Sequence, residues 1–227
     1  HGKSTTTSML AHLLIQAGLD PSFIVGANCR QIGGGSRAGS GGTEHGDILV
    51  VEACEFNRSF HELQPRHAVI LNVEADHLDI YGSLDEIVEA FAVFARKLPP
   101  GSSLGPQTAA AHQTPEGGTL LINQETPHRL AITSGLRCAV ETLGFSSQSD
   151  WRIEVSGPPP PGGRERSGPA VTVDCPGPRV YLYHCGKRVA EWLSPLPGDH
   201  MAYNAAAAAI TAWRLGSSWS QIAAGLA

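Results

Sequence analysis

The chain has 227 residues, 41% of them hydrophobic, and its 21 acidic residues outnumber its 16 lysine and arginine residues, which gives a net charge of -5. This length and hydrophobic content allow one large globular domain with a buried core. The small acidic excess argues against a nucleic acid or an anionic membrane as the main partner. No apolar run approaches the roughly 20 residues of a membrane span. The five cysteines form no C-x-x-C pair, which is typical of reduced thiols in a cytoplasmic protein.

The first predicted element is a helix over residues 4–17, directly after Gly2 and Lys3. Its apolar side chains recur on one face at helical spacing, and Gly18 stands where a C-terminal cap belongs. A short strand over residues 23–25 and a glycine-rich loop over residues 33–42 follow.

Two apolar segments are predicted to be buried parallel strands: DILVVEA (residues 47–53) and the first part of HAVILNVEADH (residues 67–77). The apolar run of the second does not alternate, as expected when both faces of a sheet are covered. Ser83 and Glu86 form a capping box that predicts a helix running to about Arg96. The order helix, strand, strand, helix, with a strand missing ahead of residue 1, predicts a doubly wound, mostly parallel α/β sheet of P-loop type, flanked by helices.

The second half of the chain changes character. Short β-like runs separated by turns predict a small antiparallel satellite sheet over residues 138–196. The proline- and glycine-rich segment 157–168 is predicted to be a variable loop inside it. Residues 102–118 are predicted to be an inserted surface loop ahead of the strand TLLIN.

Two helices are predicted at the end of the chain. The first is alanine-rich, covers about residues 200–215 and ends at Gly216, and the second begins at Trp219. The elements together predict one domain in three parts: a P-loop α/β core (1–137), a small β subdomain (138–196) and returning helices (197–227).

The start of the first predicted helix carries the tail of a phosphate-binding loop, Gly2-Lys3-Ser4, followed by Thr5. Backbone N–H groups and a lysine at a helix start can bind phosphates, and the hydroxyl group can reach Mg²⁺. Alone, this short pattern also fits an ordinary helix start with a surface lysine.

Two further candidates follow the predicted strands: Glu52 after the first, and Asp76 with His77 after the second. The carboxyl ends of strands in an open α/β sheet border the ligand crevice, so we expect all these residues to converge there. A carboxylate, an imidazole and a hydroxyl group around nucleotide phosphates are a suitable environment for Mg²⁺. Taken singly, Glu52 also fits a solvated strand end, and His77 also fits a loop histidine.

Three segments in this order and spacing resemble the central ATP-binding domain of the Mur ligases: HGKSTTTSML, VVEACEFNRSFHELQPRHAVILNVEADHLDIYGS and PLPGDHMAYNAAAAAI. The resemblance covers nearly the whole chain. Members of this family also have an N-terminal domain for a UDP-sugar and a C-terminal domain for an amino acid. The resemblance therefore implies that the sequence is a fragment that starts inside the P-loop.

The resemblance implies ATP and Mg²⁺ as cofactors and three overlapping sets of site residues. The nucleotide-binding set, with Asn204 against adenine, is Gly2, Lys3, Ser4, Thr5, His200 and Asn204. The magnesium set is Ser4, Glu52 and His77, and the catalytic set is Lys3, Glu52 and His77. Arg58 and Asn72 are implied to lie toward the other substrate.

The sequence departs from the family pattern at two motifs. Met201 replaces one adenine-side asparagine, which puts the strength of nucleotide binding in question. The common E-A-D-E-S-D keeps Glu52 and Glu55 but has Cys54 and Asn57 in place of two acids.

Within the family, the alanine-adding branch is the most similar. This implies a cytoplasmic enzyme of peptidoglycan precursor synthesis that joins UDP-N-acetylmuramate and L-alanine through an acyl phosphate. A ligase that recycles a muramyl tripeptide, and a folate or cyanophycin ligase, are alternatives. An ATP-binding module without catalysis is a hypothesis of another class, although such a module would not need the metal ligands.

Overall fold

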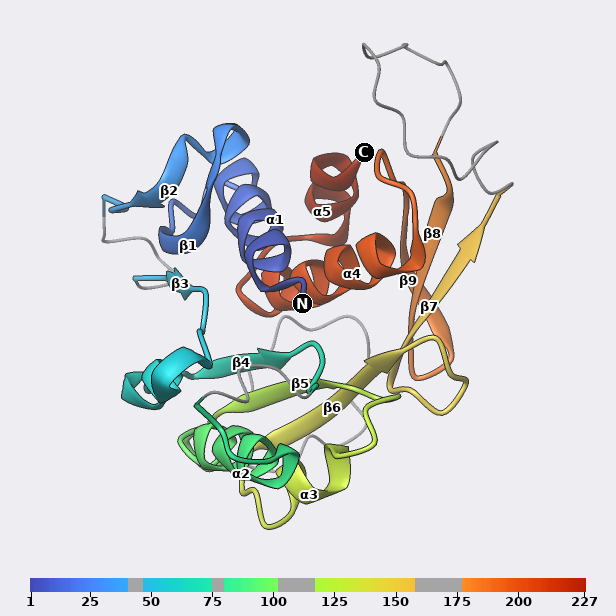
Figure 1. Ribbon diagram of the computed structural model, residues 1–227. Coiled ribbons are helices and arrows are strands. Elements are labelled where there is room, and N and C mark those ends of the chain that lie inside the picture. The colour runs from blue at the N-terminus through green and yellow to red at the C-terminus, as the bar shows by residue number, and fades with distance from the viewer. Residues whose placement is uncertain (41–46, 75–79, 102–116, 158–176) are drawn as a thin grey trace, which may run out of the picture.

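The computed structural model describes residues 1–40, 47–74, 80–101, 117–157 and 177–227 (Figure 1). The predicted site residues Asp76 and His77 lie outside the described residues, as do nearly all of the predicted loop 102–118 and nearly all of the proline- and glycine-rich segment 157–168.

A six-stranded sheet forms the centre of the fold. In spatial order its strands are β4 (His67–Ile70), β5 (Thr119–Asn123), β6 (Ala139–Gly144), β7 (Trp151–Ser156), β8 (Arg179–His184) and β9 (Lys187–Leu193). Strands β4 to β7 are parallel, and β7 to β9 are antiparallel. The antiparallel part expected in residues 138–196 is therefore β7 to β9. It is continuous with the parallel strands because Leu143 of β6 pairs with Trp151 of β7.

A separate three-stranded sheet has the order β2 (Gly34–Arg37), β1 (Ser22–Cys29) and β3 (Leu49–Val51). β1 is parallel to β3 and antiparallel to β2. The prediction that residues 33–42 form only a loop is wrong, because Arg37 pairs with Phe23 and Ser36 with Ile24. Glycine-rich sequence conceals this strand, since its pairing rests on backbone groups rather than on an apolar pattern.

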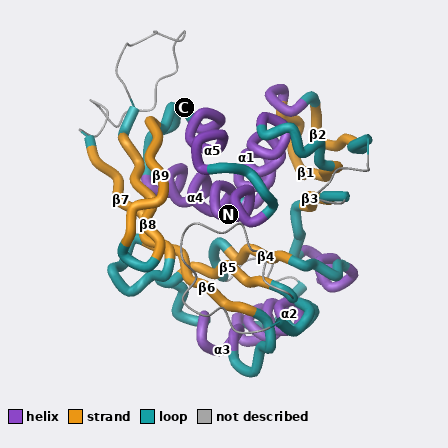
Figure 2. Tube along the Cα trace, turned by 180° about the vertical axis from the view of Figure 1, so that it is seen from behind, coloured by secondary structure: helices purple, strands orange, loops and turns teal. Residues whose placement is uncertain are grey.

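Helices cover both faces of the six-stranded sheet (Figures 1 and 2). On one side lie α1 (Lys3–Gln16), α4 (Asp199–Arg214) and α5 (Trp219–Leu226), and on the other lie α2 (Leu84–Ala95) and α3 (Arg129–Thr133). Short 3-10 helices cover Arg30–Ile32 and Phe56–Glu62. The predicted start of α2 is confirmed, since the Ser83 side chain accepts a hydrogen bond from the Glu86 N–H group.

Each face of the sheet has its own hydrophobic core. Leu121 and Leu143 point into the core that holds α1, α4 and α5. Leu120 and Ile122 belong to the core under α2 and α3. Successive residues of one strand thus enter opposite cores, which explains the uninterrupted apolar runs in the sequence.

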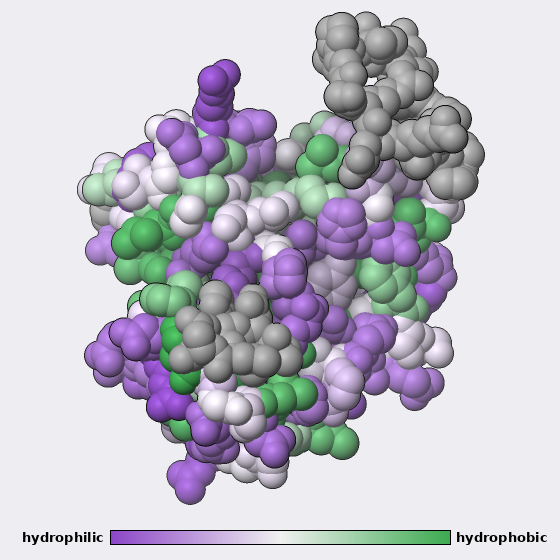
Figure 3. Space-filling view, in the orientation of Figure 1, coloured by the Kyte–Doolittle hydropathy of each residue, from purple (hydrophilic) through white to green (hydrophobic). Residues whose placement is uncertain are grey.

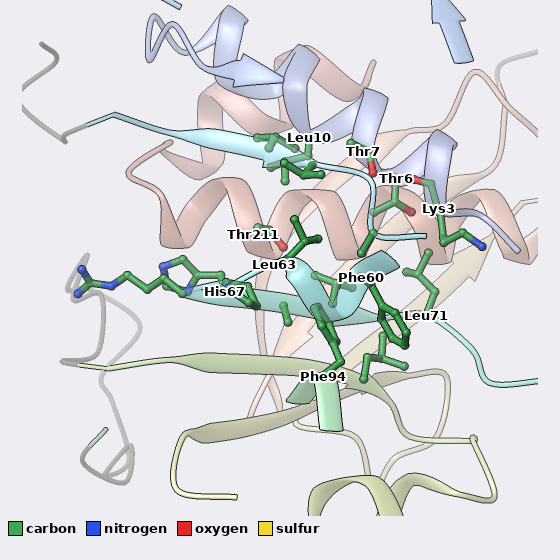
Figure 4. Close-up of a pocket in the computed structure, with 18 of the residues that line it drawn as sticks. Lys3, Thr6, Thr7, Leu10, Phe60, Leu63, His67, Leu71, Phe94 and Thr211 are labelled. Carbon is green, nitrogen blue, oxygen red and sulfur yellow. Dashed lines mark hydrogen bonds between the residues drawn. The ribbon is translucent and has the colours of Figure 1, made fainter. Parts of the chain in front are cut away.

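A cavity of about 1010 Å³ separates the two sheets. It lies between β3 and β4, and Figure 4 shows α1 and α4 on one side of it and Phe94 of α2 on the other. Its lining includes Leu10, Val50, Ala68, Phe94 and Thr211. A buried parallel strand normally has a neighbouring strand on each side and helices over both faces, and this cavity has the same surroundings. The cavity therefore fits the strand predicted ahead of residue 1.

The face seen in Figure 3 carries hydrophobic side chains in small groups among hydrophilic ones. Ile24 and Leu49, two large exposed hydrophobic residues, lie on β1 and β3 of the small sheet. Across the described ranges, no helix is both long enough and apolar enough to span a bilayer.

Candidate functional site

The candidate site begins at the first turn of α1. Gly2 caps the helix in a left-handed conformation with φ of 82°, which other residues adopt only with strain. Its carbonyl group accepts a hydrogen bond from the Thr6 N–H group at 2.9 Å. The turn places Lys3, Ser4 and Thr5 next to one another, all partly buried.

Glu52 follows β3 and contacts this turn directly. The Ser4 hydroxyl donates to Glu52 Oε1 at 2.8 Å, and the Gly26 N–H group donates to Glu52 Oε2 at 2.6 Å. Both oxygens of the carboxylate are therefore fixed, one by α1 and one by β1. A side chain at Gly26 would collide with this carboxylate, since its Cβ would lie 2.9 Å from Oε2.

A second glutamate binds the lysine of the motif. Lys3 Nζ donates to Glu55 Oε1 at 2.7 Å. Glu55 is retained in the motif after β3, but the motif by itself indicates no role for it. The available signal was its position three residues after Glu52, where the chain turns into the 3-10 helix 56–62.

The carboxyl end of β4 reaches the same place. The side-chain amide of Asn72 accepts a hydrogen bond from the backbone nitrogen of His1 at 3.1 Å and donates one to the His1 carbonyl group at 3.2 Å. The structure thus brings Lys3, Ser4 and Glu52 together beside the end of β4. Because His77 lies outside the described residues, its place in the site stays a prediction.

Helix α4 brings in Asn204 from the far end of the sequence. A Cβ added at Gly2 would lie 2.6 Å from Asn204 Oδ1, and Asn204 is buried. One turn earlier, His200 is exposed beside Gly198. Among the described residues, no hydrogen bond joins His200 to the first turn of α1.

Strands β5 and β6 end next to α4 and add side chains to the site that no sequence motif indicates. The carboxylate of Glu125 accepts hydrogen bonds from the N–H groups of Phe145 and Ser146 at 2.9 and 3.0 Å. The Phe145 ring lies 6.5 Å from the ring of Tyr203, the neighbour of Asn204. Burial raises the pKa of the Tyr203 hydroxyl far above its usual value, so this group stays protonated. The sequence feature that could have indicated these residues is their position at the carboxyl ends of strands.

The donor atoms at Ser4 and Glu52 fit a magnesium ion. Two hard oxygen donors within 2.8 Å of each other suit Mg²⁺, which completes its octahedral coordination with substrate phosphates and water. Within the parts of the chain that the structure describes, no group of three or more His, Cys, Asp or Glu side chains could hold a metal. A magnesium ion at Ser4 and Glu52 would therefore depend on phosphate oxygens.

The chain matches the Mur ligase middle domain family over residues 1–212. It is similar to UDP-N-acetylmuramate–L-alanine ligases from Caldanaerobacter subterraneus (30% identity, covering 95% of this chain and 39% of that protein) and Streptomyces coelicolor (33%, covering 100% and 42%). The corresponding ligase of Salinispora tropica is 36% identical, over 95% of this chain and 35% of that protein. The chain thus spans about two fifths of the length of these relatives.

Solved structures agree in fold. A UDP-N-acetylmuramate:L-alanyl-gamma-D-glutamyl-meso-diaminopimelate ligase from Neisseria meningitidis has a TM-score of 0.72 at 23% identity, covering 100% of this chain and 62% of that one. UDP-N-acetylmuramate-alanine ligase from Thermotoga maritima has a TM-score of 0.67 at 20% identity, covering 99% and 42%. The chain belongs to the Mur ligase family and corresponds to its middle domain.

Proposed function

We propose that this chain is the ATP-binding domain of a ligase that joins UDP-N-acetylmuramate to L-alanine and converts ATP to ADP and phosphate. The observation that carries the proposal is the meeting of Lys3, Ser4 and Glu52 at the carboxyl edge of the strands. This arrangement suits a nucleoside triphosphate with magnesium, because it combines a lysine, a helix start and a hydroxyl–carboxylate pair. We further propose that residues 1–227 act as one domain in the three parts predicted above.

The proposed reaction has two steps. The muramoyl carboxylate attacks the γ-phosphorus of ATP, and the bond to the β,γ-bridging oxygen breaks, which gives an acyl phosphate and ADP. The uncharged amino group of L-alanine then attacks the acyl carbon. Phosphate leaves and the nitrogen loses a proton, which yields the amide. No covalent bond to the protein forms in either step.

Lys3 would donate hydrogen bonds to the transferring phosphoryl group and balance its charge, because catalysis of such transfers is mainly positioning and charge stabilisation. Ser4 and Glu52 would hold a magnesium ion, which would supply positive charge against the phosphate oxygens. We propose His77 as the ligand of a second magnesium ion. Gly2 and Thr5 would contribute to the phosphate cradle through the first turn of α1.

The base of the nucleotide would lie toward α4. Asn204, which is buried next to Gly2, is the proposed adenine contact because it matches the adenine-side asparagine of the family motif. Phe145 and Tyr203 offer aromatic rings beside it. His200, exposed one turn earlier, is proposed to lie at the outer edge of this subsite.

The curated relatives at 30–36% identity carry the name of the alanine-adding enzyme, which supports L-alanine as the amino acid. The structural neighbour with a TM-score of 0.72 is a tripeptide ligase, so the tripeptide L-alanyl-γ-D-glutamyl-diaminopimelate remains the second candidate. Other regions of the complete protein would bind the UDP-sugar and the amino acid. Because ATP and UDP-sugars are cytoplasmic metabolites, we propose that the complete enzyme acts in the cytoplasm.

Incubation of the complete protein with ATP, Mg²⁺, UDP-N-acetylmuramate and either L-alanine or the tripeptide tests this proposal. Mass spectrometry of the UDP-linked product should show the mass of one added alanine. Addition of the tripeptide alone would move the protein to the recycling branch. ATP binding without either product would instead favour a module without catalysis.

A further inference from the structure

The ion pair between Lys3 and Glu55 lies at the centre of the candidate site. Its two side chains are unequally exposed, 34% for Lys3 and 13% for Glu55. A pair shielded in this way is screened by water less than a surface pair is. The lysine proposed to bind phosphate is therefore paired with a carboxylate of this chain.

The backbone of Glu55 is fixed by its neighbours. Its carbonyl oxygen accepts hydrogen bonds from the Tyr81 hydroxyl group at 2.6 Å and from the Arg58 N–H group at 3.0 Å. Tyr81 is fully buried, and the guanidinium group of Arg58 lies 5.4 Å from the centre of its ring. Asn57 and Arg58 both have left-handed backbone conformations, with φ of 52° and 54°. Residues other than glycine rarely adopt this conformation.

This strained turn keeps Glu55 in a fixed place relative to α1. The two glutamates of the motif therefore bind different partners. Glu52 already accepts from Ser4 and Gly26, whereas Glu55 accepts from Lys3.

We infer that Glu55 is a positioning residue that holds the Lys3 ammonium in the nucleotide-free site and gives it up to the phosphates of ATP. This inference rests on the proposed function, because it requires an anionic ligand at Lys3. The carboxylate binds the Lys3 ammonium at 2.7 Å, so it competes with an arriving phosphate for the same group.

The test uses Glu55→Gln in the complete protein, with Glu62→Gln as the matched control. Glu62 is exposed and lies in the 3-10 helix that follows Glu55, so its replacement removes the same charge from the same segment. Two quantities are measured: the Kd of Mg·ATP, and the rate at which an amine-acylating reagent modifies Lys3 without nucleotide, followed by peptide mass spectrometry. Circular dichroism checks that each variant is folded, and Glu55→Asp serves as a second variant that keeps the charge.

Glu55→Gln should lower the Kd of Mg·ATP about fivefold, the scale of one lost ion pair that competes with binding. It should also speed up acylation of Lys3 several-fold, whereas Glu62→Gln should change neither quantity. Glu55→Asp should stay closer to the wild type than Glu55→Gln in both measurements. A Glu55→Gln protein that matches Glu62→Gln in the acylation rate of Lys3 would overturn the inference, and so would one that binds Mg·ATP with the same Kd as Glu62→Gln.

The two proposals fail in different ways. If the wild-type protein does not bind Mg·ATP, the proposed function is wrong. Acylation of Lys3 needs no nucleotide, so faster acylation in Glu55→Gln would still support the pairing, and an unchanged rate would overturn it.

Discussion

Gly2 and Asn204, which are 202 positions apart in the sequence, are so close that a Cβ at Gly2 would lie 2.6 Å from Asn204 Oδ1. Gly2 also has φ of 82°. An alanine at position 2 would therefore have a strained backbone, and its Cβ would also collide with the Asn204 side chain of α4. Gly18, at the other end of α1, has a similar φ of 77° but nothing within 4 Å of its Cβ position.

Gly2→Ala should therefore cost more stability than Gly18→Ala. Left-handed strain costs about 1–2 kcal/mol in either variant, and the contact with Asn204 should add about 1 kcal/mol at Gly2 only. Urea unfolding of both variants measures the difference. Replacement of Asn204 by alanine in the Gly2→Ala background should recover the added part, and equal losses in the two single variants would contradict the close packing.

Lys3→Ala should lower turnover strongly with little loss of folding stability. The ammonium group is proposed to stabilise the transferring phosphoryl group, and loss of one such donor lowers kcat by roughly 100- to 1000-fold. Phosphate release and thermal unfolding of the complete protein provide the two readouts. Lys187→Ala, at an exposed position of β9, is the charge-matched control, and a Lys3→Ala enzyme as active as this control would refute the assignment.

Glu52→Gln should raise the magnesium concentration needed for half-maximal activity. The amide keeps a similar shape beside Ser4 and Gly26 but supplies a neutral ligand in place of a charged one, which binds Mg²⁺ more weakly. A magnesium titration at saturating ATP measures the shift. The exposed Glu89→Gln serves as control, and coincident titration curves for the two variants would argue against a magnesium ion at Glu52.

His67, at the start of β4, should make stability depend on pH. Burial, with the positive charges of Arg214 and Arg66, lowers its pKa from 6.5 to about 4. The folded protein then takes up this proton less readily than the unfolded chain. The stabilising contribution is fully present above pH 6.5 and is lost as the pH falls to about 4, by up to about 3 kcal/mol.

Denaturant unfolding between pH 4 and pH 7 tests this expectation. In His67→Gln the free energy of unfolding should fall less between pH 7 and pH 4 than in the wild type, and the difference is the contribution of His67. Parallel curves for the variant and the wild type would show that His67 titrates alike in the folded and unfolded states.

The cavity between β3 and β4 should be filled by the strand predicted ahead of residue 1. Adding the residues that precede His1 in the complete gene should raise Tm by several degrees, since each kcal/mol is worth about 2–4 °C in a chain of this size. Burial of the apolar lining supplies the stabilisation. A glycine-serine extension of equal length is the control, and the same Tm for both extensions would contradict a strand in this cavity.

Much of the fold was predictable because local signals agree with it. The bond from the Glu86 N–H group to Ser83 marks the start of α2 in both sequence and structure. The strands β4 and β5 follow from apolar runs that both cores require. β2 was not predictable, because Gly34 and Gly35 carry no apolar pattern and only the register with β1 makes them a strand.

The candidate site was predictable where a motif fixes both residue type and position, as at Lys3, Ser4 and Glu52. The role of Glu55 was hidden because it depends on a turn with two left-handed residues, Asn57 and Arg58, which no helical or strand period indicates. The contact of Asn204 with Gly2 depends on how α4 packs on α1, and this long-range relationship cannot be derived from either segment alone.

Phosphate release by the complete protein tests the central claim most directly. The assay contains ATP, Mg²⁺, UDP-N-acetylmuramate and L-alanine, and each component is omitted in turn. We predict release that requires all four components and disappears in Lys3→Ala. Release that continues unchanged without UDP-N-acetylmuramate or without L-alanine, or no release with all four present, would contradict the assignment of this chain to an alanine-adding ligase.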